Sequence, residues 1–180
     1  MLHFIRSYII RFLIQRELKT FTRTKKVVNL AQASSIGIIF SLESEEEYQY
    51  INSISSKLIQ AGKDVKIIGF IPDKVIPNYY LAKLKMDIFT KKELNFLGIC
   101  KKPIVERFIN EEFDLLVDLS PVDYLSLDYI SGCSHANFKT GRFRENMIDV
   151  FDFMIKKPEE MSNKTFFETV VNYLRTINTK

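Results

Sequence analysis

The sequence is poor in cysteine, histidine, glycine and proline, and each shortage excludes a class of protein. Its 180 residues include two cysteines and two histidines, and the two cysteines by themselves form neither a disulfide framework nor a zinc site. Six glycines and five prolines exclude collagen-like and low-complexity architectures. No apolar run reaches the ~18 uncharged residues that a membrane-spanning helix requires. The low cysteine content fits a reducing compartment, so we expect a cytoplasmic protein without a transmembrane span.

Motifs for nucleotides, metals and nucleophilic catalysis are also missing. Neither Gly-x-Gly-x-x-Gly nor a Walker-type Gly-Lys-Ser/Thr occurs, and Gly37 stands alone inside a predicted strand. His3 and His135 have no acidic or cysteine neighbours at metal-ligand spacing. Cys133 lies two residues before His135, but the sequence signals neither a positioned base nor an oxyanion site. We therefore predict no cofactor, no metal site and no catalytic residue.

The positive charge is concentrated at the N-terminus. Residues 1–30 contain seven basic side chains and one acid, Glu17, which gives this arm a net charge of +6 in a chain whose total is +4. The rest of the chain is nearly neutral. After a short connection, residues 34–180 are predicted to form a single domain. Such an asymmetry favours attraction of the arm to a polyanion.

The arm contains no proline or glycine through Lys26, so it is predicted to be helical. Its apolar residues fall on two sides of that helix. One side carries Ile5, Tyr8, Ile9, Phe12 and Leu13; the other carries Ile10, Ile14, Leu18 and Phe21. Two apolar flanks indicate burial against two neighbours or partial insertion into an interface.

Downstream of the arm, short apolar runs alternate with amphipathic stretches. Strands are expected over residues 35–41, 64–71, 86–89, 113–119, 136–140 and 147–155. Helices are expected from Ser44 to Gly62, from Pro103 to Asn110, from Ser120-Pro121 to Gly132, and from Asn163 to Ile177. Ser44 with Glu47 and Thr90 with Glu93 match capping boxes. The alternation predicts an α/β, Rossmann-like three-layer fold, in which a mostly parallel sheet carries helices on both faces, plus the N-terminal basic helix.

Four stretches occur in an order and spacing that resemble a known family. They are Ile36-Gly37-Ile38-Ile39-Phe40, Phe113 to Ser120, Ala136 to Gly141, and Asp152-Phe153-Met154-Ile155. Together with the basic N-terminal helix, they resemble a family of small Bacteroidota proteins defined only as a domain of unknown function. The resemblance covers nearly the whole chain. It implies a bacterial cytoplasmic protein and no particular activity.

A shorter stretch, Phe113 to Phe143, is similar to the acceptor-side half of heptosyltransferase-type glycosyltransferases. The likeness lies in the strand at 113–119, in Ser131-Gly132-Cys133 and in Thr140 to Phe143. Residues 41–44 lack that family's Gly-Asp turn, and 180 residues leave no room for its second, donor-binding domain. The likeness concerns half of a fold and implies no transferase activity.

One candidate site is the crevice at the carboxyl ends of the strands. Ligands of open parallel sheets bind there, where the strand order reverses. If strands 35–41 and 113–119 are neighbours, Ser41, Glu43, Asp118 and Ser120 line this crevice, and Ser120 begins a helix whose N–H groups could hold an anion. The alternative is structural, with Ser120 capping its helix and Asp118 bonding nearby backbone.

A second candidate is the basic segment of Lys139, Arg142 and Arg144, interleaved with Gly141 and Phe143. It could grip phosphate or a nucleic-acid backbone. A solvated strand-to-turn segment is the alternative.

Taken together, these features favour a non-enzymatic binding or adaptor protein whose arm contacts a nucleic acid, a ribonucleoprotein or an anionic membrane surface. The expected contacts are Arg6, Arg11, Arg16, Lys19, Arg23, Lys25 and Lys26. Docking of the arm on its own domain is the competing interpretation. The alternative function is an enzyme or binding protein for a small phosphorylated or sugar ligand in the strand-end crevice.

Overall fold

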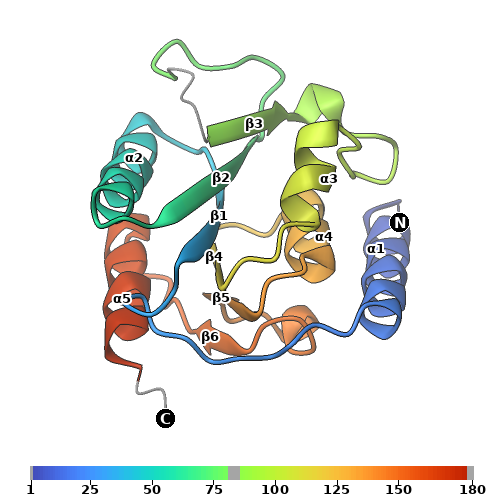
Figure 1. Cartoon of the computed structure of the whole chain (residues 1–180). Coiled ribbons are helices and arrows are strands. Elements are labelled where there is room, and N and C mark those ends of the chain that lie inside the picture. The colour runs from blue at the N-terminus through green and yellow to red at the C-terminus, as the bar shows by residue number, and fades with distance from the viewer. Residues whose placement is uncertain (1, 81–85, 178–180) are drawn as a thin grey trace.

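The fold is built on one parallel sheet of six strands in the order β3-β2-β1-β4-β5-β6 (Figure 1). We describe residues 2–80 and 86–177 of a computed structural model, and the side chains from residue 4 onward. The strands are β1 (Ser35–Ser41), β2 (Asp64–Ile71), β3 (Met86–Thr90), β4 (Leu115–Asp118), β5 (Phe138–Arg142) and β6 (Phe153–Ile155). The order grows outward in both directions from β1, as in dinucleotide-binding folds. The predicted α/β class is therefore confirmed.

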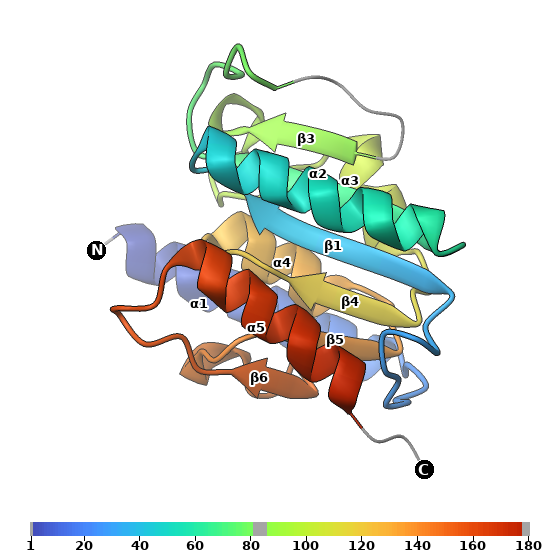
Figure 2. The ribbon, with the colours of Figure 1, turned by 90° about the vertical axis from the view of Figure 1, so that its left-hand side faces the viewer.

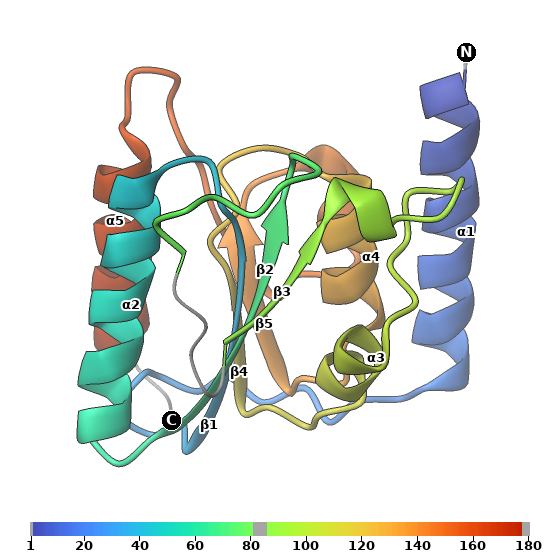
Figure 3. The ribbon, with the colours of Figure 1, turned by 90° about the horizontal axis from the view of Figure 1, so that it is seen from above.

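Helices cover both faces of the sheet, which gives three layers (Figure 3). They are α1 (Leu2–Thr20), α2 (Glu45–Gln60), α3 (Pro103–Ile109), α4 (Leu125–Cys133) and α5 (Asn163–Thr176). Helices α2 and α5 lie on one face, whereas α3 and α4 lie on the other, with α1 packed outside α4 (Figures 2 and 3). The N-terminal helix thus adds a partial fourth layer on one side only.

Several local signals act as the sequence predicts. The N–H of Glu47 donates to the Ser44 hydroxyl at the start of α2, and Gly62, with a φ of 80°, follows its end. Thr90 and Glu93 form a complete capping box around the short 3₁₀ helix η1 (Lys91–Glu93). Pro103 occupies the first turn of α3.

The arm is helical for a shorter stretch than predicted. Helix α1 ends at Thr20, where the Thr20 hydroxyl donates to the carbonyl of Arg16, and residues 21–29 form an extended strap. The strap passes beneath β6 and leads to β1 (Figure 1). Its backbone is tied to distant segments, because Lys26 N–H donates to the carbonyl of Asn137 before β5, and just after the strap Leu30 N–H donates to the carbonyl of Leu174 in α5. These long-range bonds hold an extended conformation that helix propensity does not reveal.

Two further elements differ from the prediction. Helix α4 begins at Leu125 rather than at Ser120, and residues 119–124 form a loop. The expected strand over residues 147–155 is instead a 3₁₀ helix, η2 (Glu145–Met147), followed by the short strand β6. The N–H groups of Val150 and Phe151 both donate to the Met147 carbonyl, so a turn buries these apolar side chains where a strand was predicted.

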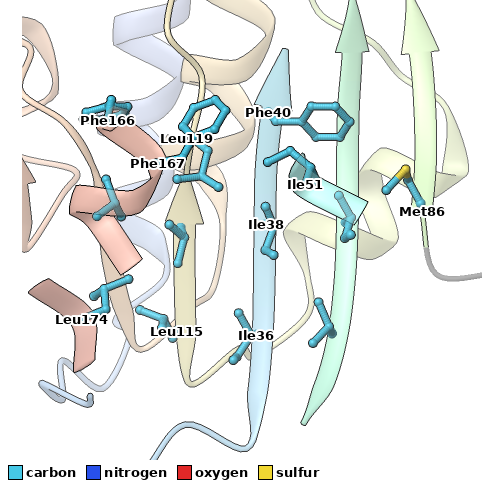
Figure 4. Close-up of a cluster of buried hydrophobic side chains, with 14 of the residues drawn as sticks. Ile36, Ile38, Phe40, Ile51, Met86, Leu115, Leu119, Phe166, Phe167 and Leu174 are labelled. Atoms are coloured by element: carbon cyan, nitrogen blue, oxygen red, sulfur yellow. The ribbon is translucent and has the colours of Figure 1, made fainter. Parts of the chain in front are cut away.

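The core consists of two apolar clusters separated by the sheet. One lies between the sheet and helices α2 and α5, with Ile36 and Ile38 of β1 and Leu119 after β4 at its centre (Figure 4). The other lies against α3 and α4, and it includes Ile10 and Ile14 of α1. Because α1 supplies fully buried side chains to the second cluster, its inner side belongs to the core.

Candidate functional site

The strand order reverses between β1 and β4, so the predicted crevice lies at their carboxyl ends. The two strands are parallel neighbours with Ile39 opposite Asp118, which brings Ser41 and Ser120 to the same edge of the sheet. All three polar side chains, Ser41, Asp118 and Ser120, are 1% exposed. The two strands are therefore neighbours, as the predicted crevice requires, but these three side chains are buried.

A network of charges holds Asp118 in place. One carboxylate oxygen accepts the Ser120 N–H at 2.9 Å. The other accepts from Arg144 at 2.7 Å and from the Ser131 hydroxyl at 3.3 Å. Arg144 also donates to Asp128, and its guanidinium lies over the ring of Phe151 at 5.4 Å. Burial raises the pKa of Asp128 to about 6, although Arg144 pulls it down.

A residue outside the sequence prediction, Tyr124, contacts the predicted crevice residue Glu43. Tyr124 in the loop after β4 donates its hydroxyl to Glu43 after β1 at 2.9 Å, and burial together with Glu43 raises the pKa of Tyr124. Beside them, Arg142 pairs with Asp123. The contact between Tyr124 and Glu43 links the loop after β4 to the residues after β1, at the edge of the sheet where Ser41 and Ser120 lie.

Ser120 plays neither of its expected roles. It precedes a loop, so no helix N-terminus points into the crevice from this position, and the predicted anion site on its N–H groups is wrong. Its hydroxyl and that of Ser41 are buried without a hydrogen-bond partner. These two unpartnered hydroxyls are the feature of the crevice that a ligand could satisfy.

The second basic segment is not a solvated turn. Lys139 is fully buried, and its ammonium donates to the carbonyls of Ser131 and Gly132 at 3.0 and 3.1 Å, at the end of α4. Burial lowers the pKa of Lys139 to about 7, and the nearby Arg23 acts in the same direction. Arg144 is equally enclosed. In this segment, Lys139 and Arg144 are paired with polar groups inside the protein and are not available to an external phosphate.

Cys133 and His135 do not form a reactive pair. Burial raises the pKa of the Cys133 thiol to about 11, which keeps it a thiol at neutral pH. The His135 ring stacks on Phe21 of the strap at 3.6 Å between centroids and lies 3.6 Å from Glu17. His3 lies outside the described side chains. Within the described part of the chain, no three metal-ligating side chains gather at one place.

The predicted basic contacts of the arm divide into two groups. Arg23 has a side chain 5% exposed and forms a bidentate pair with Asp152, both N–O distances being 2.7 Å. It also donates to the Asn137 carbonyl at 2.8 Å, so it anchors the strap. Arg6 is half-buried. The exposed cations are Arg11, Arg16, Lys19, Lys25 and Lys26.

An aromatic ridge runs along the outward side of α1. Phe4, Tyr8 and Phe12 follow one another at one-turn spacing and are 80%, 77% and 60% exposed, and Ile5 beside them is 51% exposed. Arg11, Arg16 and Lys19 lie on the same outward side. The one acid of the helix, Glu17, is half-buried toward His135. The outward face of α1 is the name we give to seven side chains: Phe4, Ile5, Tyr8, Arg11, Phe12, Arg16 and Lys19.

The sequence detects part of this face. The stripe of Ile5, Tyr8 and Phe12 is recognised as apolar, but Phe4 is missed, and periodicity does not say which of two apolar flanks is covered. Likewise, nothing in the spacing of Tyr124 or Asp128 predicts the contact of Tyr124 with Glu43 or that of Asp128 with Arg144. Only the repeat of aromatic residues at positions 4, 8 and 12 could have pointed to the ridge.

Comparison with known sequences supports the resemblance to an uncharacterised family and adds no activity. A search of curated proteins finds no match. The similarity to heptosyltransferase-type enzymes stays a prediction, and Ser131, Gly132 and Cys133 lie within helix α4 rather than in a turn. A family model matches residues 6–177, nearly the whole chain. The chain therefore belongs to the family of unknown function DUF6913.

Proposed function

We propose that the protein is a binding protein that attaches to an anionic membrane surface through the outward face of α1. The observation that supports this most is the exposed aromatic ridge of Phe4, Tyr8 and Phe12 on a helix whose other side is already buried in the core. Contiguous exposed apolar side chains beside basic ones are typical of interfacial helices. Within the described residues, no helix has the length and apolarity needed to cross a bilayer.

The apolar ridge favours a lipid surface over a nucleic-acid duplex. Phosphate contacts need cations and hydrogen-bond donors, and they leave aromatic side chains exposed to water. In a bilayer interface the same rings are buried among headgroups and acyl chains. Burial of one Phe side chain stabilises by about 1.5–3 kcal/mol, so Phe4 and Phe12 together supply a substantial part of a weak membrane affinity.

The cations add a second, salt-dependent contribution. Arg11, Arg16 and Lys19 are exposed on the same side as the ridge. A basic side chain near an anionic surface contributes about 1 kcal/mol, and the attraction falls off within a Debye length, about 8 Å at physiological salt. Arg23 is excluded from this role because Asp152 and backbone carbonyls already occupy its guanidinium.

Vesicle flotation tests the proposal. The full chain should float with vesicles that contain phosphatidylcholine and phosphatidylglycerol, and less with phosphatidylcholine alone. Phe4→Ser/Tyr8→Ser/Phe12→Ser should lose binding at all salt concentrations. Arg11→Gln/Arg16→Gln/Lys19→Gln should remove the preference for anionic lipid.

Matched controls lie elsewhere on the surface. Val75→Ser/Ile76→Ser changes two exposed apolar side chains after β2, and Lys156→Gln/Lys164→Gln changes two exposed cations; both should leave flotation unchanged. Equal flotation of the ridge variant and the wild type would reject the proposal. Retention of a nucleic acid, or a concentration-dependent dimer lost in the ridge variant, would assign the face to a different partner.

A small ligand in the strand-end crevice is the second candidate function. The unpartnered hydroxyls of Ser41 and Ser120 favour it, because an oxygen-rich phosphorylated or sugar ligand would satisfy both. Access requires the contact between Tyr124 and Glu43 to open.

A further inference from the structure

A cavity of about 330 Å³ lies between α2 and α5, on the sheet face opposite α1 (Figure 3). Its floor is formed by β1 and β4, which are visible between the two helices in Figure 2. Ile36, Ile38 and Leu119 contribute to that floor and point toward the helices in Figure 4. Small-molecule sites are apolar concavities of about 300–1,000 Å³ with few polar groups, so this cavity has the size and lining of a small-ligand site.

Helices α2 and α5 contact each other near their N-termini and diverge toward their C-termini. Near their N-termini, Asn163 of α5 donates to Glu47 of α2, and Tyr50 stacks on Phe167 at 5.7 Å between centroids. Toward their C-termini the ribbons separate (Figure 2). The lining of the cavity runs from Tyr50 to the last turns of both helices, and we call the part beside the exposed Lys57 and Arg175 its open end.

Charge is arranged along the cavity in the same direction. Lys57 in the last turn of α2 and Arg175 in the last turn of α5 line the cavity and are exposed. The acid of the lining, Glu168, lies two turns before Arg175, about 10 Å along the helix. An anion at the open end would meet two cations, whereas a cation there would be repelled.

We infer that the cavity between α2 and α5 binds a small amphipathic anion, an apolar chain that ends in a carboxylate. The chain lies on the apolar floor and the carboxylate reaches Lys57 and Arg175. This site is separate from the outward face of α1, because the sheet lies between them (Figure 3).

Decanoate is the probe, used below its micelle-forming concentration. Titration followed by methyl NMR should give saturable shifts of Ile36 and Ile38 and leave Ile5 unaffected. Decanol should bind several-fold more weakly, and decyltrimethylammonium more weakly still. Absence of saturable decanoate binding, or shifts confined to α1, would overturn the inference.

Variants separate the apolar and ionic contributions. Val171→Phe fills the cavity from α5 and Leu58→Phe fills it from α2, so each should weaken decanoate binding at least about tenfold. Lys57→Gln/Arg175→Gln should weaken decanoate about three- to tenfold and leave decanol binding unchanged. Arg107→Gln/Lys156→Gln, two exposed cations elsewhere, should change neither.

The outcome is independent of membrane attachment. The variant Phe4→Ser/Tyr8→Ser/Phe12→Ser should bind decanoate as the wild type does. Unchanged binding in both filling variants, with each shown to be folded by its methyl spectrum, would reject the cavity as the site.

Discussion

Gly132 of α4 and Ile14 of α1 touch with no room for a side chain between them. A Cβ atom at position 132 would lie 2.6 Å from Ile14 Cγ1, closer than carbon atoms approach without displacement. The absence of a side chain at position 132 therefore determines how closely α1 approaches the core. Through this contact, one side of the basic helix α1 packs against α4, and the opposite side faces outward.

Gly132→Ala should push α1 away from α4 and destabilise the protein. Overpacking of this kind costs about 1–3 kcal/mol, measurable by urea unfolding. Trypsin cleavage at Arg16 and Lys19 should become faster because the helix is held less tightly. The double variant Gly132→Ala/Ile14→Ala should lose less unfolding free energy than the sum of the losses of the two single variants, because the shorter side chain makes room for the new methyl group. A loss equal to that sum would contradict the contact.

Arg23→Met should destabilise the protein far more than Lys25→Gln. Both cations face Asp152, but Arg23 is buried and bidentate, whereas Lys25 is 68% exposed and 3.7 Å away. Removing one partner of a buried pair costs about 3–5 kcal/mol, and removing an exposed partner costs about 0–1 kcal/mol. Urea unfolding of both variants checks this difference; equal losses would show that the strap is not anchored at Arg23.

Lys139 should make stability depend on pH. Its pKa is about 7 in the folded protein and about 10.4 in an unfolded chain. Between these values the unfolded state binds a proton that the folded state does not, so the free energy of unfolding rises with pH by up to about 1.4 kcal/mol per unit. Burial also raises the pKa values of Cys100 and Cys133, which opposes the trend at higher pH.

The comparison with Lys139→Met tests this contribution best up to pH 9, because Lys139 also lowers the pKa of Cys133 and that thiol stays protonated over this range in both proteins. Unfolding free energies measured at pH 7, 8 and 9 should show the stability of the wild type rising relative to the variant. A difference that stays constant with pH would mean that Lys139 keeps its proton inside the protein.

The fold could be predicted from the sequence because its signals are local. The β-branched run at Ile36 to Phe40, the cap at Ser44 and the glycine at position 62 each act on neighbouring residues, and all agree with the structure. Elements held by distant contacts were predicted less well. The strap depends on Arg23 meeting Asp152, which is 129 residues away.

The candidate sites show the same difference between local signals, which the sequence contains, and distant contacts, which it does not reveal. The sequence places Ser41 and Asp118 at one edge because parallel strands end together, and β1 and β4 are indeed neighbours. It does not show that Arg144 neutralises Asp118 or that Tyr124 reaches Glu43. Such contacts depend on the conformations of the loops that follow the strands, and loop conformation leaves no periodic pattern in a single sequence. The sequence therefore predicts which strands are neighbours and does not predict the side-chain contacts made at their ends.

Ser120→Ala distinguishes a structural crevice from a ligand site. The buried, unpartnered hydroxyl imposes a desolvation cost of about 1–3 kcal/mol, so its removal should raise the unfolding free energy by about 1 kcal/mol. Ser44→Ala, which removes the cap of α2, is the matched control and should lower it by a similar amount. Thermal unfolding with inorganic phosphate and with glucose 6-phosphate then tests the crevice. A melting-temperature increase in the wild type that Ser120→Ala removes would support the small-ligand function, and no increase with either compound would leave Ser120 with a purely structural place in the fold.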